Sequence, residues 1–298
     1  MRQRATWTAL VVMLLVAFAA VHAQDQYLDV YTAQVKPEKR ADFDAINKKL
    51  AAANRQNKGD EWLAMETAYG PMNRVTFVSM RDSYGAAEKG GDAFTAAVEK
   101  SLGKAASEKL FQDFNQTLAS SRSEIRKRRW DLSSNAPSDA AAMAKMLGES
   151  RWLRTTIIHV RPGQGPAYEA LLKDIKTARE KSSPDVTILV SQAVAGQEGG
   201  VFYVTQLAKS MATFDSSPSL QKVLGDEGYA HYLKAASEIV ANTESVINHF
   251  LPELSNPPAN VVAAAPDYWA PKAIVAKAAP AKKSVVNAAE TAKEETKK

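Results

Sequence analysis

The chain has 298 residues, with 38 Lys and Arg against 33 Asp and Glu, and a formal net charge of +5. This length allows one large domain or two small ones with a sizeable hydrophobic core. The sequence contains no cysteine, which excludes disulfide frameworks, cysteine nucleophiles, thiolate zinc sites and iron–sulfur clusters. A net positive charge suggests a polyanionic partner, so the place of the excess charge along the chain matters.

The N-terminus has the pattern of a secretory signal peptide over residues 1–23. Two arginines precede an apolar run from Ala9 to Ala20, and small residues stand before Gln24. The alternative is a membrane anchor, but the run is about 12 residues, fewer than the roughly 20 that span a bilayer. We expect export to the periplasm or the extracellular space, with no transmembrane segment after cleavage.

The C-terminus changes composition at Pro257. Residues 257–298 contain 13 Ala, 7 Lys and 5 Pro with no sustained apolar period, which predicts a disordered tail. A cationic tether to an anionic polymer of the cell envelope is the alternative role for it. The leader carries two arginines and the tail seven lysines against four acids, so the body between them is neutral. We therefore expect no nucleic-acid partner.

The body contains an internal repeat. Residues 27–37 read as a strand, and Phe43, Ile46 and Leu50 follow at helical spacing. Residues 152–162, which lie 125 positions later, repeat this pattern with Tyr168, Leu171 and Ile175. Two further strands are expected in each copy, at 62–69 and 75–80 in the first and at 187–194 and 201–206 in the second.

A second helix and a last strand close each copy. The expected helical stripes are Leu110, Phe111, Phe114 and Leu118 in the first copy, and Tyr232, Leu233, Ala236 and Val240 in the second. The two closing segments match at an offset of 122, which places His249 at the position of Lys127. Each copy therefore has the order β-α-β-β-α-β, the ferredoxin-like arrangement, in an α+β fold. We expect the copies at 24–135 and 151–256, joined by a linker at 136–150.

Val35-Lys36-Pro37 with Phe43, and Val160-Arg161-Pro162-Gly163 with Tyr168, resemble the strand end and helix start of the dimeric α+β barrel superfamily. Glu38 replaces the glycine in the first copy. Members of this superfamily, which includes antibiotic biosynthesis monooxygenase-like proteins, are quinol-type monooxygenases, haem-handling enzymes, isomerases and proteins of no known activity. The resemblance implies two sheets that face each other across a ligand-binding lumen, completed here by two tandem copies within one chain.

The resemblance does not carry over the catalytic residues of the monooxygenases. Their strand-one Asn position falls at Tyr31 and Thr156, and their strand-three Trp position falls near Met80 and Gln206. We therefore predict a protein without conventional catalytic groups that binds a small hydrophobic or aromatic molecule or has a role in the cell envelope. A monooxygenase or haem-handling enzyme that uses the lumen is the alternative.

The predicted ligand pocket consists of aromatic, hydroxyl and imidazole side chains on the strands. They are Tyr31, Trp62, Thr156, His159, Tyr203 and His249. His249 is the best candidate for a haem ligand, although we expect no cofactor, and His231 is expected to be a solvated surface residue. The spacing of the histidines gives no metal motif.

One dense basic run, Arg126-Lys127-Arg128-Arg129, lies in the body. On a strand, Arg126 and Arg128 point to one face and Lys127 and Arg129 to the other. We interpret this run as an edge strand that its charges protect from aggregation.

Overall fold

The computed structural model describes residues 26–270. The expected signal peptide and the part of the expected tail beyond residue 270 lie outside the described residues.

The first copy contains the four predicted strands and three helices. Its strands are β1 (Tyr27–Val35), β2 (Leu63–Tyr69), β3 (Arg74–Arg81) and β4 (Leu118–Arg128). Its helices are α2 (Arg40–Asn57), α3 (Tyr84–Leu102) and α4 (Lys104–Gln116). The prediction of one second helix was incomplete, because α3 and α4 both precede β4.

The second copy repeats this order and is flanked by short helices. Its strands are β5 (Trp152–Val160), β6 (Leu189–Ala195), β7 (Val201–Ala208) and β8 (Val240–Phe250). Its helices are α6 (Gly165–Ser182), α7 (Ala212–Ser216) and α8 (Leu220–Ile239). The linker forms α5 (Ala140–Glu149), and α9 (Ala259–Ala264) and α10 (Pro266–Trp269) follow β8.

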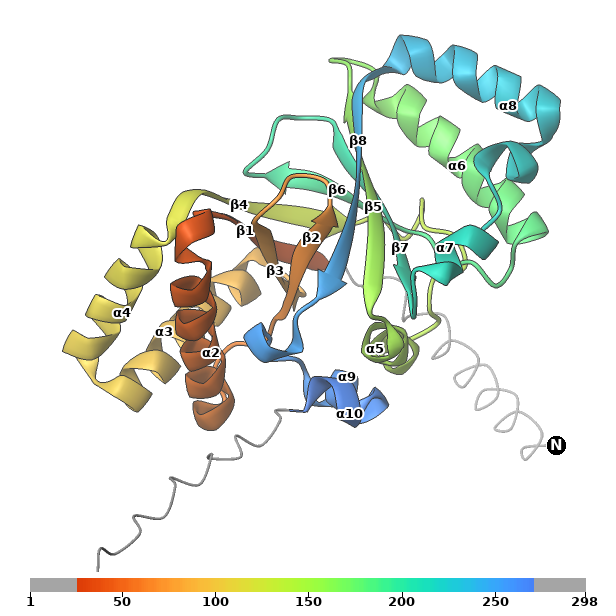
Figure 1. The fold of residues 1–298 in the computed structure, drawn as a ribbon. Coiled ribbons are helices and arrows are strands. Elements are labelled where there is room, and N and C mark those ends of the chain that lie inside the picture. The colour runs from red at the N-terminus through yellow and green to blue at the C-terminus, as the bar shows by residue number, and fades with distance from the viewer. Residues whose placement is uncertain (1–25, 271–298) are drawn as a thin grey trace, which may run out of the picture.

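The eight strands form one closed antiparallel barrel in the order β1-β3-β2-β8-β5-β7-β6-β4. Within a copy the first strand pairs with the third and fourth, and the copies join through the β2–β8 and β4–β6 pairs. Figure 1 shows this barrel with α2, α3 and α4 on one side and α6 and α8 on the other. The predicted fold, a dimeric α+β barrel built from two ferredoxin-like units within one chain, is confirmed.

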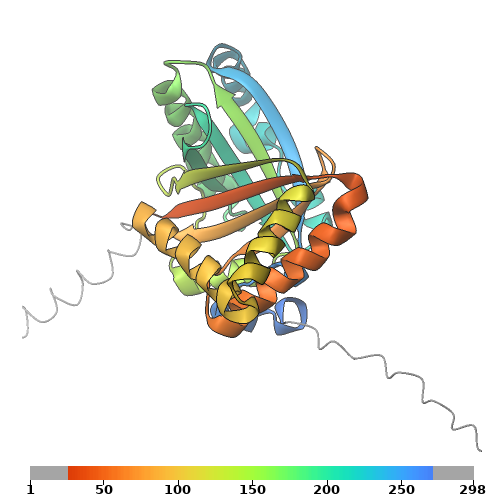
Figure 2. The ribbon, with the colours of Figure 1, turned by 90° about the vertical axis from the view of Figure 1, so that its left-hand side faces the viewer.

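The helices cover the outer faces of the two sheets. The predicted stripe of Phe43, Ile46 and Leu50 on α2 is buried, as are Tyr168 and Leu171 on α6. The same separation of the two helical layers is visible after a quarter turn (Figure 2). Among residues 26–270, no helix combines the length and the apolar character needed to cross a membrane.

The repeat extends to details of the backbone. A glycine with positive φ breaks the helical segment before the last strand in both copies, at Gly103 (φ 80°) and Gly225 (φ 71°). The strand register corrects one expected correspondence, because Met80 pairs with Leu28 and Leu207 with Leu153. The counterpart of Met80 is therefore Leu207 and not Gln206.

Two predicted helix residues are strand residues instead. Leu118 is the first residue of β4, and Val240 is the first residue of β8. In the first copy, Thr117 ends the helix by donating its hydroxyl to the carbonyl oxygen of Phe114 at 2.6 Å. The chain then enters the barrel, where β-branched and aliphatic side chains fit the pleated surface well.

The first part of the expected disordered tail is folded against the barrel. Helices α9 and α10 contain Val261 and Trp269, which are 0% and 1% exposed. Trp269 packs edge-on against Phe250, with ring centroids 5.4 Å apart. The prediction of disorder from Pro257 onward is therefore wrong for residues 257–270, because these apolar side chains gain a buried surface that composition alone does not reveal. We call residues 257–270 the C-terminal strap.

Candidate ligand-binding lumen

The barrel encloses a cavity of about 470 Å³. Strand side chains alternate between two faces, so every second residue of each strand points into this lumen. All eight strands contribute lining residues, as does α5. An eight-stranded barrel of this kind is wide enough to be filled by side chains or to hold one small ligand. The volume falls within the range of roughly 300–1,000 Å³ that is usual for ligand pockets.

One end of the lumen is apolar and closed. The lining side chains there include Leu63, Leu153, Leu189 and Phe250 from four different strands. Helix α5 packs against them through Met143 and Leu147, which also line the cavity. Asp139 caps the helix by accepting a hydrogen bond from the backbone N–H of Ala142 at 2.8 Å. The linker between the copies thus forms a plug, for which we use the name α5 plug.

The C-terminal strap holds the α5 plug in place. The indole Nε1 of Trp269 donates to the carbonyl oxygen of Gly148 at 2.8 Å. A Cβ at Gly148 would lie 2.6 Å from the carbonyl oxygen of Val261, so only glycine permits this close approach. The guanidinium of Arg151 lies 3.8 Å from the ring centroid of Tyr268. Figure 1 shows α5, α9 and α10 together at this end of the barrel.

The other end of the lumen is polar. Its lining includes Ser120, Ser121 and Arg122 on β4, all of which are exposed to solvent. Gln34 and His159, at corresponding positions of β1 and β5, also line the cavity and are partly exposed. The lumen is therefore amphipathic, with a solvent-exposed polar end and a closed apolar end.

A buried carboxylate lies between these two ends. Glu124 is 5% exposed, and its Oε2 accepts a hydrogen bond of 2.7 Å from the hydroxyl of Tyr203. Arg126 forms an ion pair with Oε1 and lies 3.5 Å from the ring centroid of Tyr203. Burial, together with the neighbouring charge of Glu124, raises the pKa of Tyr203 to about 12. The phenol is therefore a neutral hydrogen-bond donor, and Arg126 compensates the charge of Glu124.

Arg128 is the exception in this pattern. It lines the lumen two residues beyond Arg126 on the same face of β4 and is 9% exposed. No described residue pairs with its guanidinium through a carboxylate, and its Nε is buried without a hydrogen-bond partner. Burial, and secondarily the charge of Arg126, lower the pKa of Arg128 to about 10, so it remains charged at neutral pH. Buried charges in proteins are normally paired because desolvation is costly.

The remaining charges of the lumen do not compensate Arg128. Four arginines and two glutamates line the cavity. Arg74 faces Glu244 at 3.8 Å, and Arg126 pairs with Glu124. This leaves Arg122 in solvent at the polar end and Arg128 at the closed, otherwise apolar end, where no described carboxylate pairs with it.

The structure divides the six side chains of the predicted pocket between the two faces of the strands. Tyr203 and His159 line the lumen. Tyr31 and Trp62 pack instead with the helix-facing core of the first copy. Thr156 and His249 are also absent from the cavity wall, because their neighbours Thr155, Ile157 and Asn248 occupy the inward positions. The strand alternation thus brings two of the six together in the cavity and directs four to the opposite face.

The interpretation of the basic run as an edge strand was wrong. β4 pairs with β1 on one side and β6 on the other, so it has no free edge. The alternation itself was predicted correctly, since Arg126 and Arg128 share the lumen face. Arg129 points the other way and binds Glu169 at 2.7 Å. Barrel closure, which the local sequence does not show, decides that the shared face of Arg126 and Arg128 is an interior one.

The described residues of the lumen do not fit a haem. An axial ligand is usually a histidine oriented by a second hydrogen bond, or a deprotonated tyrosine or cysteine. His249 lies outside the cavity, with its ring 4.7 Å from that of Trp152. His159 lies towards the polar end, and no described residue accepts a hydrogen bond from its ring. Tyr203 is kept protonated by its raised pKa.

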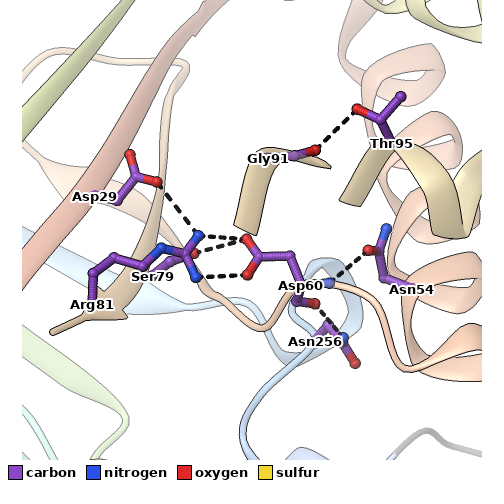
Figure 3. Close-up of polar contacts among 8 residues, drawn as sticks. All are labelled: Asp29, Asn54, Asp60, Ser79, Arg81, Gly91, Thr95 and Asn256. Carbon is purple, nitrogen blue, oxygen red and sulfur yellow. Dashed lines mark hydrogen bonds and ion pairs between the residues drawn. The ribbon is translucent and has the colours of Figure 1, made fainter. Parts of the chain in front are cut away.

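A second polar cluster lies on the helix side of the first sheet and has a structural role. Arg81 donates to both carboxylate oxygens of Asp60 at 2.6 Å and approaches Asp29 at 3.4 Å (Figure 3). A Cβ at Gly90 of α3 would lie 2.5 Å from the guanidinium, so the helix packs directly on it. Asn256 donates to the carbonyl oxygen of Asp60 at 2.6 Å. The cluster ties β1 and β3 to the chain immediately before the C-terminal strap.

This chain resembles several solved structures at low sequence identity. No protein-family model and no curated protein matches the sequence. Among solved structures, an anthrone oxidase-like protein is 12% identical with a TM-score of 0.48, and the match covers 76% of this chain and 92% of the other. Chlorite dismutase from Candidatus Nitrospira defluvii, in complex with imidazole, is 9% identical with a TM-score of 0.42 over 76% and 92%. A haem-binding protein from Thermus thermophilus is 12% identical with a TM-score of 0.41 over 78% and 92%.

Proposed function

We propose that this protein binds a small amphipathic organic molecule in the lumen of its barrel. The observation that carries this proposal is the cavity of about 470 Å³, which is apolar and closed at the α5 plug and polar at its other end. Protein interiors are close-packed, and empty space of this size is rare in them. A helix that closes the apolar end without filling the cavity is the arrangement expected of a ligand-binding protein.

The polar side chains of the lumen support binding more than covalent chemistry. General acid–base catalysis needs a titratable group near the operating pH and within hydrogen-bond reach of the reacting atom. Among the described lining residues, Glu124 is held by Arg126 and Tyr203, and Glu244 faces Arg74. His159 lies at the solvent-exposed polar end, and no described residue orients its ring. These contacts set the polarity of the cavity and can orient a ligand. A monooxygenase or haem-handling activity is the alternative function.

The proposal is tested with N-phenyl-1-naphthylamine, a neutral aromatic probe that becomes fluorescent in apolar surroundings. We expect saturable binding to the full chain at a stoichiometry of one. Leu207→Trp, at a lumen position, enlarges a lining side chain and should weaken binding by about 5- to 140-fold, since overpacking costs about 1–3 kcal/mol. Leu233→Trp is the matched control because Leu233 is 50% exposed on α8.

Two outcomes would contradict the proposal. One is the absence of saturable probe binding to the folded wild-type protein, and the other is an equal effect of the two tryptophan substitutions. Circular dichroism shows whether each variant is folded. Titration with haem tests the alternative separately, because a Soret shift at a stoichiometry of one would favour haem handling over the binding of other small molecules.

A further inference from the structure

We propose that Arg128 binds the carboxylate of the ligand, so that the lumen is selective for an organic monoacid with an apolar body. This inference rests on the proposed function and specifies its ligand class. Its starting point is the buried Arg128 side chain, which lines the cavity and has no carboxylate partner among the described residues.

No described residue around Arg128 compensates its charge. Its neighbours in the adjoining strands are Ser191 of β6, directly opposite, and Gln26, whose carbonyl oxygen accepts from the Arg128 backbone at 2.7 Å. Gln26 Oε1 is also buried without a partner, but a neutral amide cannot neutralise a guanidinium. The ring of Trp130 is 5.6 Å away. The site thus contains the planar guanidinium donors of Arg128, with Ser191 nearby and no described carboxylate to pair with them.

A carboxylate fits this arrangement better than a multiply charged group. A guanidinium presents parallel N–H donors that match the two oxygens of a carboxylate. Among residues 26–270, Arg128 is the one buried cation of the lumen without a carboxylate partner, and a dianion would therefore leave a buried negative charge unpaired. Leu28 and Leu189 line the cavity beside β4 and supply apolar contacts for the rest of the ligand.

Only the first copy contains this site. At the offset of 122, the residue that corresponds to Arg128 in the second copy is Phe250, which lines the lumen at the equivalent position of β8. The corresponding residue for Arg126 is Asn248. The pseudo-symmetry of the barrel therefore does not generate a second arginine, and we expect one acid per chain.

The test compares decanoate with 1-decanol as competitors of N-phenyl-1-naphthylamine, since the two differ mainly in the charged group. In the wild type, decanoate should compete at least about tenfold more strongly than decanol. Arg128→Met should weaken decanoate by about 10- to 100-fold, the usual range for a lost hydrogen-bonded charge, and change decanol less than about threefold. Decyl phosphate, a dianion near pH 8, should compete less well than decanoate.

Arg122→Met is the matched control, because Arg122 lines the solvent-exposed end of the same strand. It should change both competitors equally and little. A second readout separates ligand recognition from a structural role: Arg128→Met should raise the melting temperature of the ligand-free protein, because the substitution removes an unpaired buried charge.

The outcomes distinguish the two proposals. If the neutral probe does not bind, the lumen proposal fails. If the probe binds but decanoate and decanol compete equally, or Arg128→Met and Arg122→Met behave alike, the lumen proposal stands and the assignment of Arg128 is overturned. A melting temperature that falls on Arg128→Met would likewise show that the guanidinium has a structural partner.

Discussion

Replacement of Trp269 by alanine should release the C-terminal strap and loosen the α5 plug. The indole is 1% exposed, its Nε1 donates to Gly148 of the plug at 2.8 Å, and its ring packs edge-on against Phe250 at 5.4 Å and Tyr268 at 5.1 Å. It therefore joins the end of the strap both to the plug helix and to the last barrel strand.

The size of the effect follows from these contacts. A buried tryptophan removes about 150–250 Å² from water, which at about 25 cal/mol per Å² corresponds to roughly 4–6 kcal/mol. Substitutions of buried Phe and Trp by Ala typically cost about 3–5 kcal/mol. We expect this loss in the free energy of unfolding if the strap and the barrel unfold together. For a domain of this size it corresponds to a fall of about 6–20 °C in melting temperature.

Thermal unfolding followed by circular dichroism measures the loss, and hydrogen exchange locates it. Amides of α5 should exchange faster in Trp269→Ala than in the wild type, because their cover is gone. Trp269→Phe keeps part of the ring contacts but loses the hydrogen bond and some packing, so it should cost less than Trp269→Ala, about 1–2 kcal/mol. Tyr84→Ala is the control for an exposed aromatic, since Tyr84 is 52% exposed. An unfolding free energy for Trp269→Ala within about 1 kcal/mol of that control would refute the reasoning.

Two further substitutions test the ion pairs on the helix side of the sheets. Asp60→Asn leaves the 9%-exposed side chain of Arg81 with only the longer contact to Asp29. Urea unfolding should show that the free energy of unfolding falls by about 3 kcal/mol. The double variant Asp60→Asn with Arg81→Met should recover most of this loss, and equal losses in the single and double variants would contradict the pairing. Hydrogen bonds from Arg129 hold the pKa values of Glu169 and Asp131 below their usual range. The two ion pairs therefore stabilise the folded protein above about pH 4, and this stabilisation declines as the pH falls through the lowered pKa values of the two carboxyl groups. Arg129→Gln should therefore lower the free energy of unfolding by about 1 kcal/mol at pH 7. It should also make the free energy of unfolding depend less on pH below about pH 4. If the free energies of the wild type and the variant change in parallel with pH, this explanation is contradicted.

The fold could be predicted because it is encoded twice. The stripe of Phe43, Ile46 and Leu50 and the stripe of Tyr168 and Leu171 both fix a helix against a sheet, and either copy supports the assignment of the other. The local sequence pattern could not predict how far the ordered chain continues after β8. Ala- and Pro-rich composition predicts disorder, but Trp269 finds a buried place only because Gly148, 121 residues earlier, allows a close approach.

The site could be predicted only in part. Period-two alternation places Arg126 and Arg128 on the same face of their strand, but it does not say which face of a strand is the interior one. The aromatic residues Tyr31 and Trp62 were natural candidates for a pocket, yet they pack under the helices. The charged residues Glu124 and Arg128 were weak candidates because charges are rarely buried. Their burial depends on β4 pairing with β6 of the other copy.

Fusion of the two copies explains how the lumen became asymmetric. A symmetric dimer of identical chains presents each lining residue twice, on opposite walls. Here β4 carries Glu124, Arg126 and Arg128, whereas the equivalent positions of β8 carry Val246, Asn248 and Phe250. One wall can therefore be charged while the opposite wall is largely apolar. The linker between the copies exists only in a fused protein, and as α5 it closes one end of the barrel together with the C-terminal strap. The proposed binding of a single amphipathic ligand in one orientation needs such an asymmetric cavity, because two identical walls would offer the ligand two equivalent orientations.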